Sequence, residues 1–239
     1  MKVRVFLNVD LGELPDEPEA LYACAHVANI ACGGHVGDER SMRRAVDRCR
    51  THAVRVGAHP SYPDREGFGR KRVTMTPEAL QASIAEQCGR LAAVAGGFGE
   101  AIAFVKPHGA LYHAAGSDLA VAEALVDATS GSLGRDVTII GPPRSTLATA
   151  AARARLAYAP EGFADRATRA DGSLVARDEP GALLLDPATA AARARELASG
   201  GEVATVCVHG DTPGALAIAR AVRAALDAVA DASGSGPWA

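Results

Sequence analysis

Short runs of apolar, mostly β-branched residues alternate along the chain with longer stretches in which apolar residues recur at helical spacing. Such runs are typical of buried strands, and the spacing in the longer stretches is typical of amphipathic helices. The predicted strands are Val3–Asp10, Val27–Cys32, Val54–His59, Ala101–Lys106, Val137–Gly141, Leu156–Pro160 and Val203–His209. The predicted helices are Glu39–His52, Pro77–Ala95, Asp118–Ser130, Arg144–Arg155, Pro187–Ser199 and Pro213–Ala230. The alternation indicates repeated βα units around a parallel sheet.

Seven predicted strands in 239 residues leave roughly 34 residues for each unit, close to the repeat of a βα barrel. We therefore expect a seven-stranded parallel βα barrel, formed by a single domain over residues 1–232, with a doubly wound open sheet as the alternative. Asp38, the Thr76-Pro77 pair and the Thr212-Pro213 pair each supply a capping residue or a first-turn proline for a predicted helix. Residues 233–239 (SGSGPWA) have the composition of a flexible tail.

Two segments do not fit the alternation of predicted strands and helices. Residues 61–74 (SYPDREGFGRKRVT) form a polar connection that is longer than an ordinary βα loop, which makes it a candidate lid. Residues 167–177 (ATRADGSLVAR) place an Asp171-Gly172 turn signal between two short extended pieces. We therefore expect a small hairpin inserted after the sixth strand.

The charge and cysteine content narrow the partners and the compartment. Lysine and arginine number 25 against 28 aspartates and glutamates, for a formal charge of -3. This balance gives no reason to expect binding to nucleic acid or to an anionic membrane. The first residues, MKVRVFLNVD, predict neither a signal peptide nor a spanning helix. Five cysteines without a C-x-x-C pair argue against a disulfide framework, so we expect reduced thiols in a cytoplasmic protein.

Ionisable and amide side chains stand at the carboxyl ends of most predicted strands. In a parallel barrel these ends share one rim, where active sites form. The recurrence therefore predicts one pocket that gathers the side chains. They are Asn8, Asp10, Glu13, Asn29, Cys32, His35, His59, Lys106, His108, Glu161, Asp165, His209 and Asp211.

The residue types leave several chemistries open. Asp10 and Glu161 are candidate general acids or bases. Lys106 fits a Schiff base, a cation for a carboxylate or phosphate, or half of a buried ion pair, and the second role is favoured. Asp10 and the rim histidines are suitable metal ligands, although no close-spaced ligand signature occurs. The chain has no G-x-x-x-x-G-K-[ST] phosphate loop, and Cys32 fits a buried small hydrophobe better than a nucleophile.

Six segments in order along the chain carry a family resemblance: LNVDLGE, NIACGGHVGD, GAHPSYPDREGFGR, KPHGALY, EGFADR and CVHGDTPGA. Together they resemble the LamB/YcsF family of 5-oxoprolinase A subunits. The resemblance implies a seven-stranded barrel similar to NodB-type deacetylases, and cleavage of 5-oxo-L-proline to L-glutamate driven by ATP as co-substrate. It also implies partner subunits B and C. Because the chain lacks a phosphate loop, we hypothesise that a phosphorylated lactam is opened here.

The resemblance assigns residues by position. It implies proton transfer by Asp10, His108 or Glu161, and anion recognition by Lys106 and Arg166. The expected substrate-binding residues are Asn8, Glu13, His35, His59, Tyr62, Lys106, Arg166, His209 and Asp211. The metal candidates are Asp10, His35 and His59, for a divalent ion of unknown identity.

The chain departs from the family pattern at Gly34, at Thr168 and over residues 14–18 (LPDEP). We expect these changes to border the pocket and to bear on the choice of substrate. Two other functions stay open at this stage. One is a metal-dependent deacetylase of the NodB-like type that works alone, and the other is a noncatalytic ligand-binding subunit.

Overall fold

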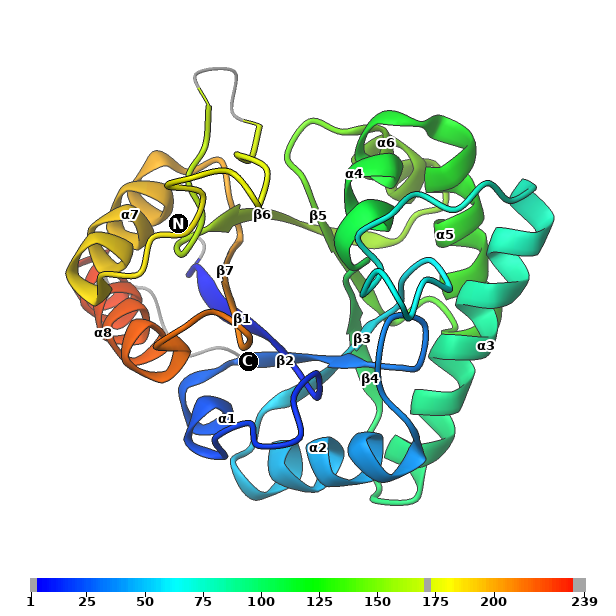
Figure 1. Ribbon diagram of the computed structural model, residues 1–239, viewed down its shortest axis with the longest axis horizontal. Helices are drawn as coiled ribbons and strands as arrows, with labels where there is room; N and C mark the ends of the chain where they lie inside the picture. Colours follow the sequence, from blue (N-terminus) through cyan, green and yellow to red (C-terminus); the bar gives the residue numbers. More distant parts are fainter. Residues whose placement is uncertain (1–3, 170–172, 234–239) are drawn as a thin grey trace.

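The computed structural model describes residues 4–169 and 173–233, and seven parallel strands close into a barrel in sequence order (Figure 1). Parallel pairing of the first strand with the last completes the ring. The strands are β1 (Phe6–Leu11), β2 (Val27–Ala31), β3 (Arg55–His59), β4 (Ile102–Val105), β5 (Thr138–Gly141), β6 (Ala157–Phe163) and β7 (Thr205–His209). The predicted barrel is confirmed, and the open-sheet alternative is excluded.

The helices surround the ring of strands (Figure 1). They are α1 (Ala20–Cys24), α2 (Glu39–Thr51), α3 (Pro77–Gly96), α4 (Gly109–Ser117), α5 (Leu119–Leu133), α6 (Thr146–Arg153), α7 (Pro187–Gly200) and α8 (Ala215–Ser233). All six predicted helices are present, whereas α1 and α4 were not predicted.

The predicted start of α2 is confirmed, whereas the last helix begins later than predicted. Asp38 caps α2 in a reciprocal capping box with Ser41, as its residue type indicates. The last helix begins at Ala215, two residues after Pro213. The Thr212 hydroxyl donates to Asp165 at 2.7 Å, so this side chain is engaged across the barrel mouth.

The interior of the barrel is layered along its axis. The end of the interior where β1 and β2 begin is filled by the apolar cluster Phe6, Val27, Phe104, Ile140 and Ala159. The next inward positions on β1 are Asn8 and Asp10, because side chains of a strand alternate between its two faces. The intervening Leu7 and Val9 belong to the larger core outside the barrel, which the helices share. The sequence therefore places an apolar plug beneath a polar layer.

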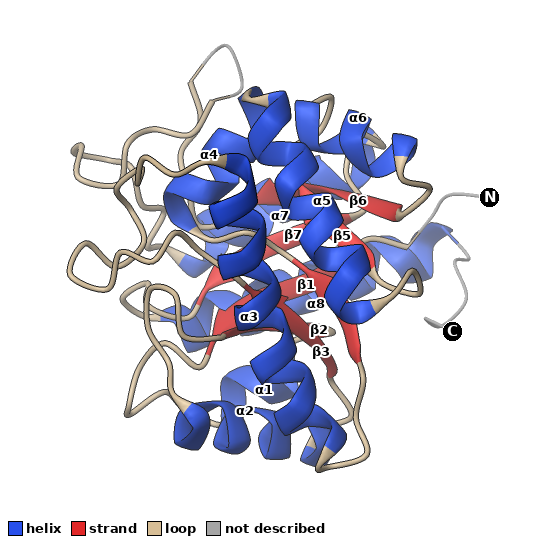
Figure 2. Ribbon diagram, turned by 90° about the vertical axis from the view of Figure 1, so that its right-hand side faces the viewer, coloured by secondary structure: helices blue, strands red, loops and turns tan. Residues whose placement is uncertain are grey.

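The two irregular segments lie at the carboxyl ends of the strands, where the loops on the left of Figure 2 gather. Arg65 in the 61–74 segment donates to the carbonyls of Gly33 and Gly37, so the candidate lid is fastened to the neighbouring loop. The predicted hairpin is present at its base, where Thr168 pairs antiparallel with Leu174. Its predicted turn at 171–172 lies outside the described residues.

The predicted tail, residues 233–239, lies outside the described residues except for Ser233, the last residue of α8. No helix in the described ranges combines the length and the apolar composition that a bilayer crossing requires.

Candidate functional site

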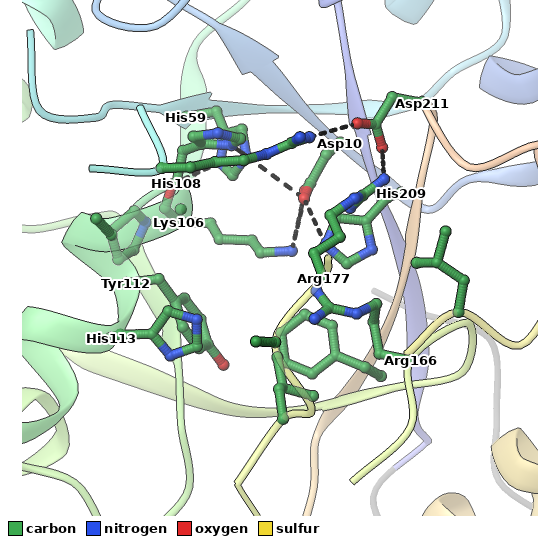
Figure 3. A pocket seen from close by; sticks show the side chains of 18 of the residues that line it. Asp10, His59, Lys106, His108, Tyr112, His113, Arg166, Arg177, His209 and Asp211 are labelled. Atoms are coloured by element: carbon green, nitrogen blue, oxygen red, sulfur yellow. Dashed lines mark hydrogen bonds and ion pairs between the residues drawn. The ribbon is translucent and has the colours of Figure 1, made fainter. Parts of the chain in front are cut away.

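A cavity of about 670 Å³ opens at the carboxyl ends of the strands (Figure 3). Its floor contains Asp10 and Lys106, and the histidines His59, His108 and His209 stand around them. The hairpin after β6 supplies apolar and charged side chains to the wall. The remaining lining residues include Glu13, Arg70, Tyr112, His113, Phe163, Arg166, Leu174, Val175, Arg177, Asp178, Leu183 and Asp211.

Lys106 is the buried cation of the floor. Its Nζ lies 2.9 Å from Asp10 Oδ1 and 3.0 Å from Glu161 Oε1. It also contacts Asn8 Oδ1 at 3.2 Å and Cys207 Sγ at 2.9 Å. Burial lowers the pKa of Lys106, but the charges around it hold the pKa well above its ordinary value. Protein acceptors surround the ammonium group, so the structure shows Lys106 in a buried ion pair. The favoured role, as a cation for a ligand anion, stays a prediction.

Asp10 stays ionised beside this cation. Burial raises the pKa of its carboxyl group, but the neighbouring His59 and Lys106 hold it well below its usual range. The amide of Asn29 donates to Oδ1 at 2.8 Å. Oδ2 lies 3.4 Å from His59 Nε2 and 3.9 Å from His209 Nε2. Asp10 is therefore a carboxylate with histidine nitrogens on two sides.

Glu161 and Asn8 lie beneath the cavity and are absent from its lining. The Asn8 amide donates to Glu161 Oε1 at 2.8 Å, and burial raises the pKa of this glutamate. The Glu161 carboxylate therefore orients Lys106 and does not reach the cavity. The role that sequence reasoning assigned to Glu161, proton transfer to substrate, remains a prediction without support from its location.

Three imidazoles and one carboxylate form a cluster on the side of the cavity next to β3 and β4. His35 stacks on His108 with ring centroids 3.7 Å apart, and its Nε2 lies 3.0 Å from Glu13 Oε1. His108 Nδ1 lies 3.1 Å from His59 Nε2 and 3.4 Å from Glu13 Oε1. His59 lies at the end of β3, while His108 is the residue before the first turn of α4 and makes no side-chain capping hydrogen bond.

Gly69 fixes the approach of the 61–74 segment to this cluster. Its φ of 68° lies in the left-handed region, and a Cβ there would stand 2.8 Å from His35 Cβ and 2.9 Å from His108. Only glycine allows the backbone this close. The preceding carbonyl, that of Phe68, accepts a hydrogen bond from His108 Nε2 at 2.9 Å. The candidate lid thereby holds an imidazole of the site in place.

His209 and Asp165 form a histidine–carboxylate pair on the opposite side. His209 Nδ1 lies 3.0 Å from Asp165 Oδ1, and the His209 backbone N–H donates to Oδ2 at 3.0 Å. Burial lowers the pKa of His209, but the charge and hydrogen bonds of Asp165 raise it above its ordinary value. Asp165 is fully buried and itself has a lowered pKa, since the charge of His209 and the hydrogen bonds to the carboxylate outweigh the effect of burial.

The mouth of the cavity is cationic. Three arginines, Arg70, Arg166 and Arg177, line it with two aspartates, Asp178 and Asp211. Asp211 accepts hydrogen bonds from Arg70 and Arg177, which come from the 61–74 segment and the hairpin. Arg166 is 7% exposed and donates to the Val175 carbonyl at 2.7 Å. Its Nε has no hydrogen-bond partner in the described part of the chain.

Most predicted site residues converge, but some lie apart from the cavity. Asp10, Glu13, His59, Lys106, His108, Arg166, His209 and Asp211 all line it. Tyr62 lines a different cavity together with Arg72 and Asp118, so its predicted contact with substrate has no support here. His35 lies behind His108, and Cys32 is fully buried in the hydrophobic core.

The three departures from the family pattern do not border the main cavity. A Cβ at Gly34 would stand 2.3 Å from Gln87 Oε1 and 2.4 Å from Ser61 Oγ, in a packed position behind the site. Thr168 accepts a hydrogen bond from Arg193. In the 14–18 segment, Glu17 turns inward and accepts from the Gly12 N–H and the Tyr22 hydroxyl. The expectation that these positions shape the pocket wall is wrong.

Several residues that line the cavity were not predicted from the sequence. Tyr112 and His113 lie on α4, Phe163 ends β6, and the hairpin contributes Leu174 and Arg177. The KPHGALY and EGFADR segments contained Tyr112 and Phe163, and His113 follows the first of them directly. The helix that follows His108, and therefore faces the rim, was not predicted. Nothing in the sequence indicated that the hairpin folds inward.

Two groups of side chains have ligand atoms close enough to hold a metal ion. One consists of Glu13, His59 and His108, and the other of Asp10, Cys207 and His209. His35, one of the predicted metal ligands, belongs to neither group. Its Nε2 lies 3.0 Å from Glu13 Oε1.

Comparisons with known proteins point to the same family as the six sequence motifs. The A subunit of 5-oxoprolinase from Chloroflexus aurantiacus is 44% identical over 239 residues, covering 93% of this chain and 94% of that protein. The corresponding 5-oxoprolinase chain of Symbiobacterium thermophilum is 40% identical and covers 94% of this chain and 92% of that protein. The crystal structure of a lactam utilization protein from Thermus thermophilus has a TM-score of 0.86 and 33% identity, covering 95% of this chain and 97% of that one. The LamB/YcsF profile matches residues 5–233, and the chain belongs to the LamB/YcsF family.

Proposed function

We propose that this chain is the A subunit of an ATP-dependent 5-oxoprolinase, which opens the lactam of 5-oxo-L-proline to give L-glutamate. The names of its relatives supply the substrate class. The observation that carries the proposal on the chain itself is the His209–Asp165 pair facing ionised Asp10 across the floor of the cavity. This combination suits lactam hydrolysis, because water must lose a proton and the departing ring nitrogen must gain one.

The mouth of the cavity fits the substrate carboxylate. Arg166 presents a buried guanidinium whose Nε has no partner among the described residues, and guanidinium groups bind carboxylates through paired hydrogen bonds. Phe163 and Leu174 supply an apolar wall beside it for the methylene carbons of the ring. Arg70 and Arg177 share one carboxylate, Asp211, which leaves the mouth attractive to an anion.

His209 is the proposed proton donor to the ring nitrogen. Asp165 accepts the Nδ1 hydrogen, so the second nitrogen, Nε2, is the one directed toward the cavity floor. The raised pKa of His209 favours the protonated form, which has a proton to give.

Asp10 is the proposed acceptor of a proton from the attacking water. Its lowered pKa keeps it ionised, and Asn29 and Lys106 fix the orientation of the carboxylate. His108, the other predicted proton carrier that lines the cavity, donates through Nε2 to a backbone carbonyl. It therefore fits a fixed position better than a proton relay.

We assign the use of ATP to the whole complex, because this chain lacks a phosphate-loop motif. In the proposed sequence, partner subunits B and C transfer a phosphoryl group from ATP to the lactam oxygen. Water then adds to the ring carbon, and the C–N bond breaks as the nitrogen takes a proton, which leaves an acyl phosphate on the side-chain carboxyl. A second water hydrolyses this acyl phosphate and releases phosphate. The products are glutamate, ADP and phosphate. We place the complex in the cytoplasm, because all five cysteines of this chain are unpaired thiols.

The test is reconstitution with candidate B and C subunits and a panel of lactams. Glutamate release that needs 5-oxoproline, ATP and all three subunits supports the proposal. Hydrolysis of an acetylated sugar by this chain alone, abolished by a chelator, would establish the deacetylase alternative instead. Saturable 5-oxoproline binding with no turnover in the full complex would establish the noncatalytic alternative.

A further inference from the structure

His59 and His108 each turn one ring nitrogen toward the other. His59 Nδ1 lies 2.7 Å from the Lys106 carbonyl oxygen, and His108 Nε2 lies 2.9 Å from the Phe68 carbonyl oxygen. A carbonyl only accepts hydrogen bonds, so each of these nitrogens carries the hydrogen of its ring. In neutral rings the remaining nitrogens, His59 Nε2 and His108 Nδ1, then present lone pairs to each other at 3.1 Å.

One carboxylate oxygen completes this arrangement. Glu13 Oε1 lies 3.4 Å from His108 Nδ1 and 3.8 Å from His59 Nε2. Each of the three side chains is nine-tenths or more buried. Lone pairs and a carboxylate that converge in a dry site repel one another unless a cation lies between them. The nearby Lys106 ammonium does not serve this purpose, because its ion pairs are with Asp10 and Glu161.

The cluster is held in place from behind. His35 contacts Glu13 Oε1 at 3.0 Å, which orients the carboxylate, and its ring stacks on His108. Partners of this kind, behind the first set of ligands, fix ligand orientation in metal sites.

We propose that Glu13, His59 and His108 bind one divalent transition-metal ion at the edge of the cavity. Two imidazole nitrogens and one carboxylate oxygen suit Zn²⁺, Mn²⁺, Fe²⁺ or Co²⁺ better than Mg²⁺ or Ca²⁺, which prefer oxygen ligands. The second group of possible ligands is a poorer site, because the Lys106 ammonium already lies 2.9 Å from both Asp10 Oδ1 and Cys207 Sγ.

The bound ion would lie beside the proposed acid and base, since its three ligands line the same cavity. It would supply a Lewis acid for a carbonyl or phosphoryl oxygen. The inference rests on the ligands alone, and it holds whether the substrate is 5-oxoproline or another small acid.

The experiment measures metal binding by the isolated full-length chain. Protein stripped with a chelator is titrated at neutral pH with Zn²⁺ and with Mn²⁺ by calorimetry, and Co²⁺ is added to record its visible absorption. We expect about one ion per chain, nitrogen and oxygen ligation in the cobalt spectrum, and a rise in melting temperature with free metal.

Variants assign the ligands. Glu13→Gln and His108→Gln should each weaken binding at least ~10–100-fold, and His35→Asn should weaken it ~10-fold by releasing Glu13. His113→Gln is the matched control, because His113 lines the same cavity outside the cluster. Its affinity should equal that of the parent chain. Circular dichroism in the absence of metal shows whether each variant is folded.

Failure of the stripped, folded parent chain to bind Zn²⁺ and Mn²⁺ stoichiometrically would overturn the inference and leave a proton shared between His59 and His108. Full binding by the folded Glu13→Gln and His108→Gln variants would overturn it as well. Either result leaves the proposed lactam hydrolysis standing, because that is judged by glutamate release from the complex.

Discussion

The imidazole of His209 and the carboxylate of Asp165 face each other at the mouth of the barrel, with Nδ1 3.0 Å from Oδ1 and 3.1 Å from Oδ2. The same carboxylate accepts the His209 backbone N–H and the Thr212 hydroxyl. Three donors from one turn thus converge on a fully buried side chain. This fixes the ring orientation and leaves Nε2 directed toward Asp10.

Replacing Asp165 with asparagine should lower kcat in the reconstituted complex by ~10²–10⁴-fold, with a smaller effect on KM. The amide removes the charge that holds the His209 ring and favours its protonated form. Steady-state glutamate release measures both constants. The control is Thr212→Val, which removes one hydrogen bond to Asp165 and leaves the His209 contact intact. Equal rates for Asp165→Asn and the parent would exclude His209 as the proton donor.

Replacing Arg166 with methionine should raise KM for 5-oxoproline by ~10–100-fold, because a buried guanidinium to carboxylate contact is lost. The parent should prefer 5-oxoproline strongly over pyrrolidin-2-one, which lacks the carboxylate. The variant should lose most of this preference. Arg144→Met is the control, since Arg144 is exposed and pairs with Glu202 away from the cavity. Unchanged discrimination in Arg166→Met would place carboxylate recognition elsewhere.

Replacing Lys106 with methionine should destabilise the folded chain by ~3–5 kcal/mol, because Asp10 and Glu161 would be left buried without their cation. Urea unfolding at neutral pH measures the change. Adding Glu161→Gln to Lys106→Met should recover part of the lost stability, since one uncompensated charge is then removed. A Lys106→Met chain as stable as the parent would contradict the role of Lys106 as an obligatory buried ion pair.

Acidification should destabilise the fold through His26. Burial, reinforced by Arg223, lowers the pKa of His26 to about 4, and its Nδ1 accepts the Leu7 N–H at 3.0 Å. The unfolded chain, with an ordinary pKa near ~6.5, binds the proton first as the pH falls. The contribution of His26 is therefore fully present above ~6.5 and is lost progressively toward pH 4.

The measurement is the urea unfolding free energy of the parent and of His26→Asn at several pH values from 7 to about 4. Asparagine offers an oxygen acceptor to the Leu7 N–H but does not titrate. The stability of the variant should fall less steeply over this window. Parallel curves for the two proteins would show that His26 does not titrate with a depressed pKa.

The periodic pattern of the chain was sufficient to predict the barrel and much of its rim. Apolar runs marked all seven strands, since a buried parallel strand needs apolar side chains on its outward face. Residues at the strand ends, such as Asp10, His59 and His209, converge because parallel strands finish at one edge of the barrel.

The sequence pattern could not show which of the rim side chains reach the cavity and which lie behind or beneath its lining. His35 and Glu161 share the chemical character of His108 and Asp10, yet one lies behind the histidine stack and the other beneath the lysine. Tyr62 follows the same strand as His59 and still lines another cavity, because the loop between them turns away. In a loop, a shift of one residue changes the surface that a side chain faces, and loops have no regular period from which this direction could be predicted.

By itself the sequence determined the alternation of strand and helix, the family and the residue types available at the rim, because these depend on local pattern and on short motifs. Only the tertiary structure decided which groups act as pairs. Lys106 meets Asp10 and Glu161, His209 meets Asp165, and His59 meets His108 through contacts between distant strands and loops. Partners of this kind depend on ångström-scale distances and on burial, and both arise only when the barrel closes.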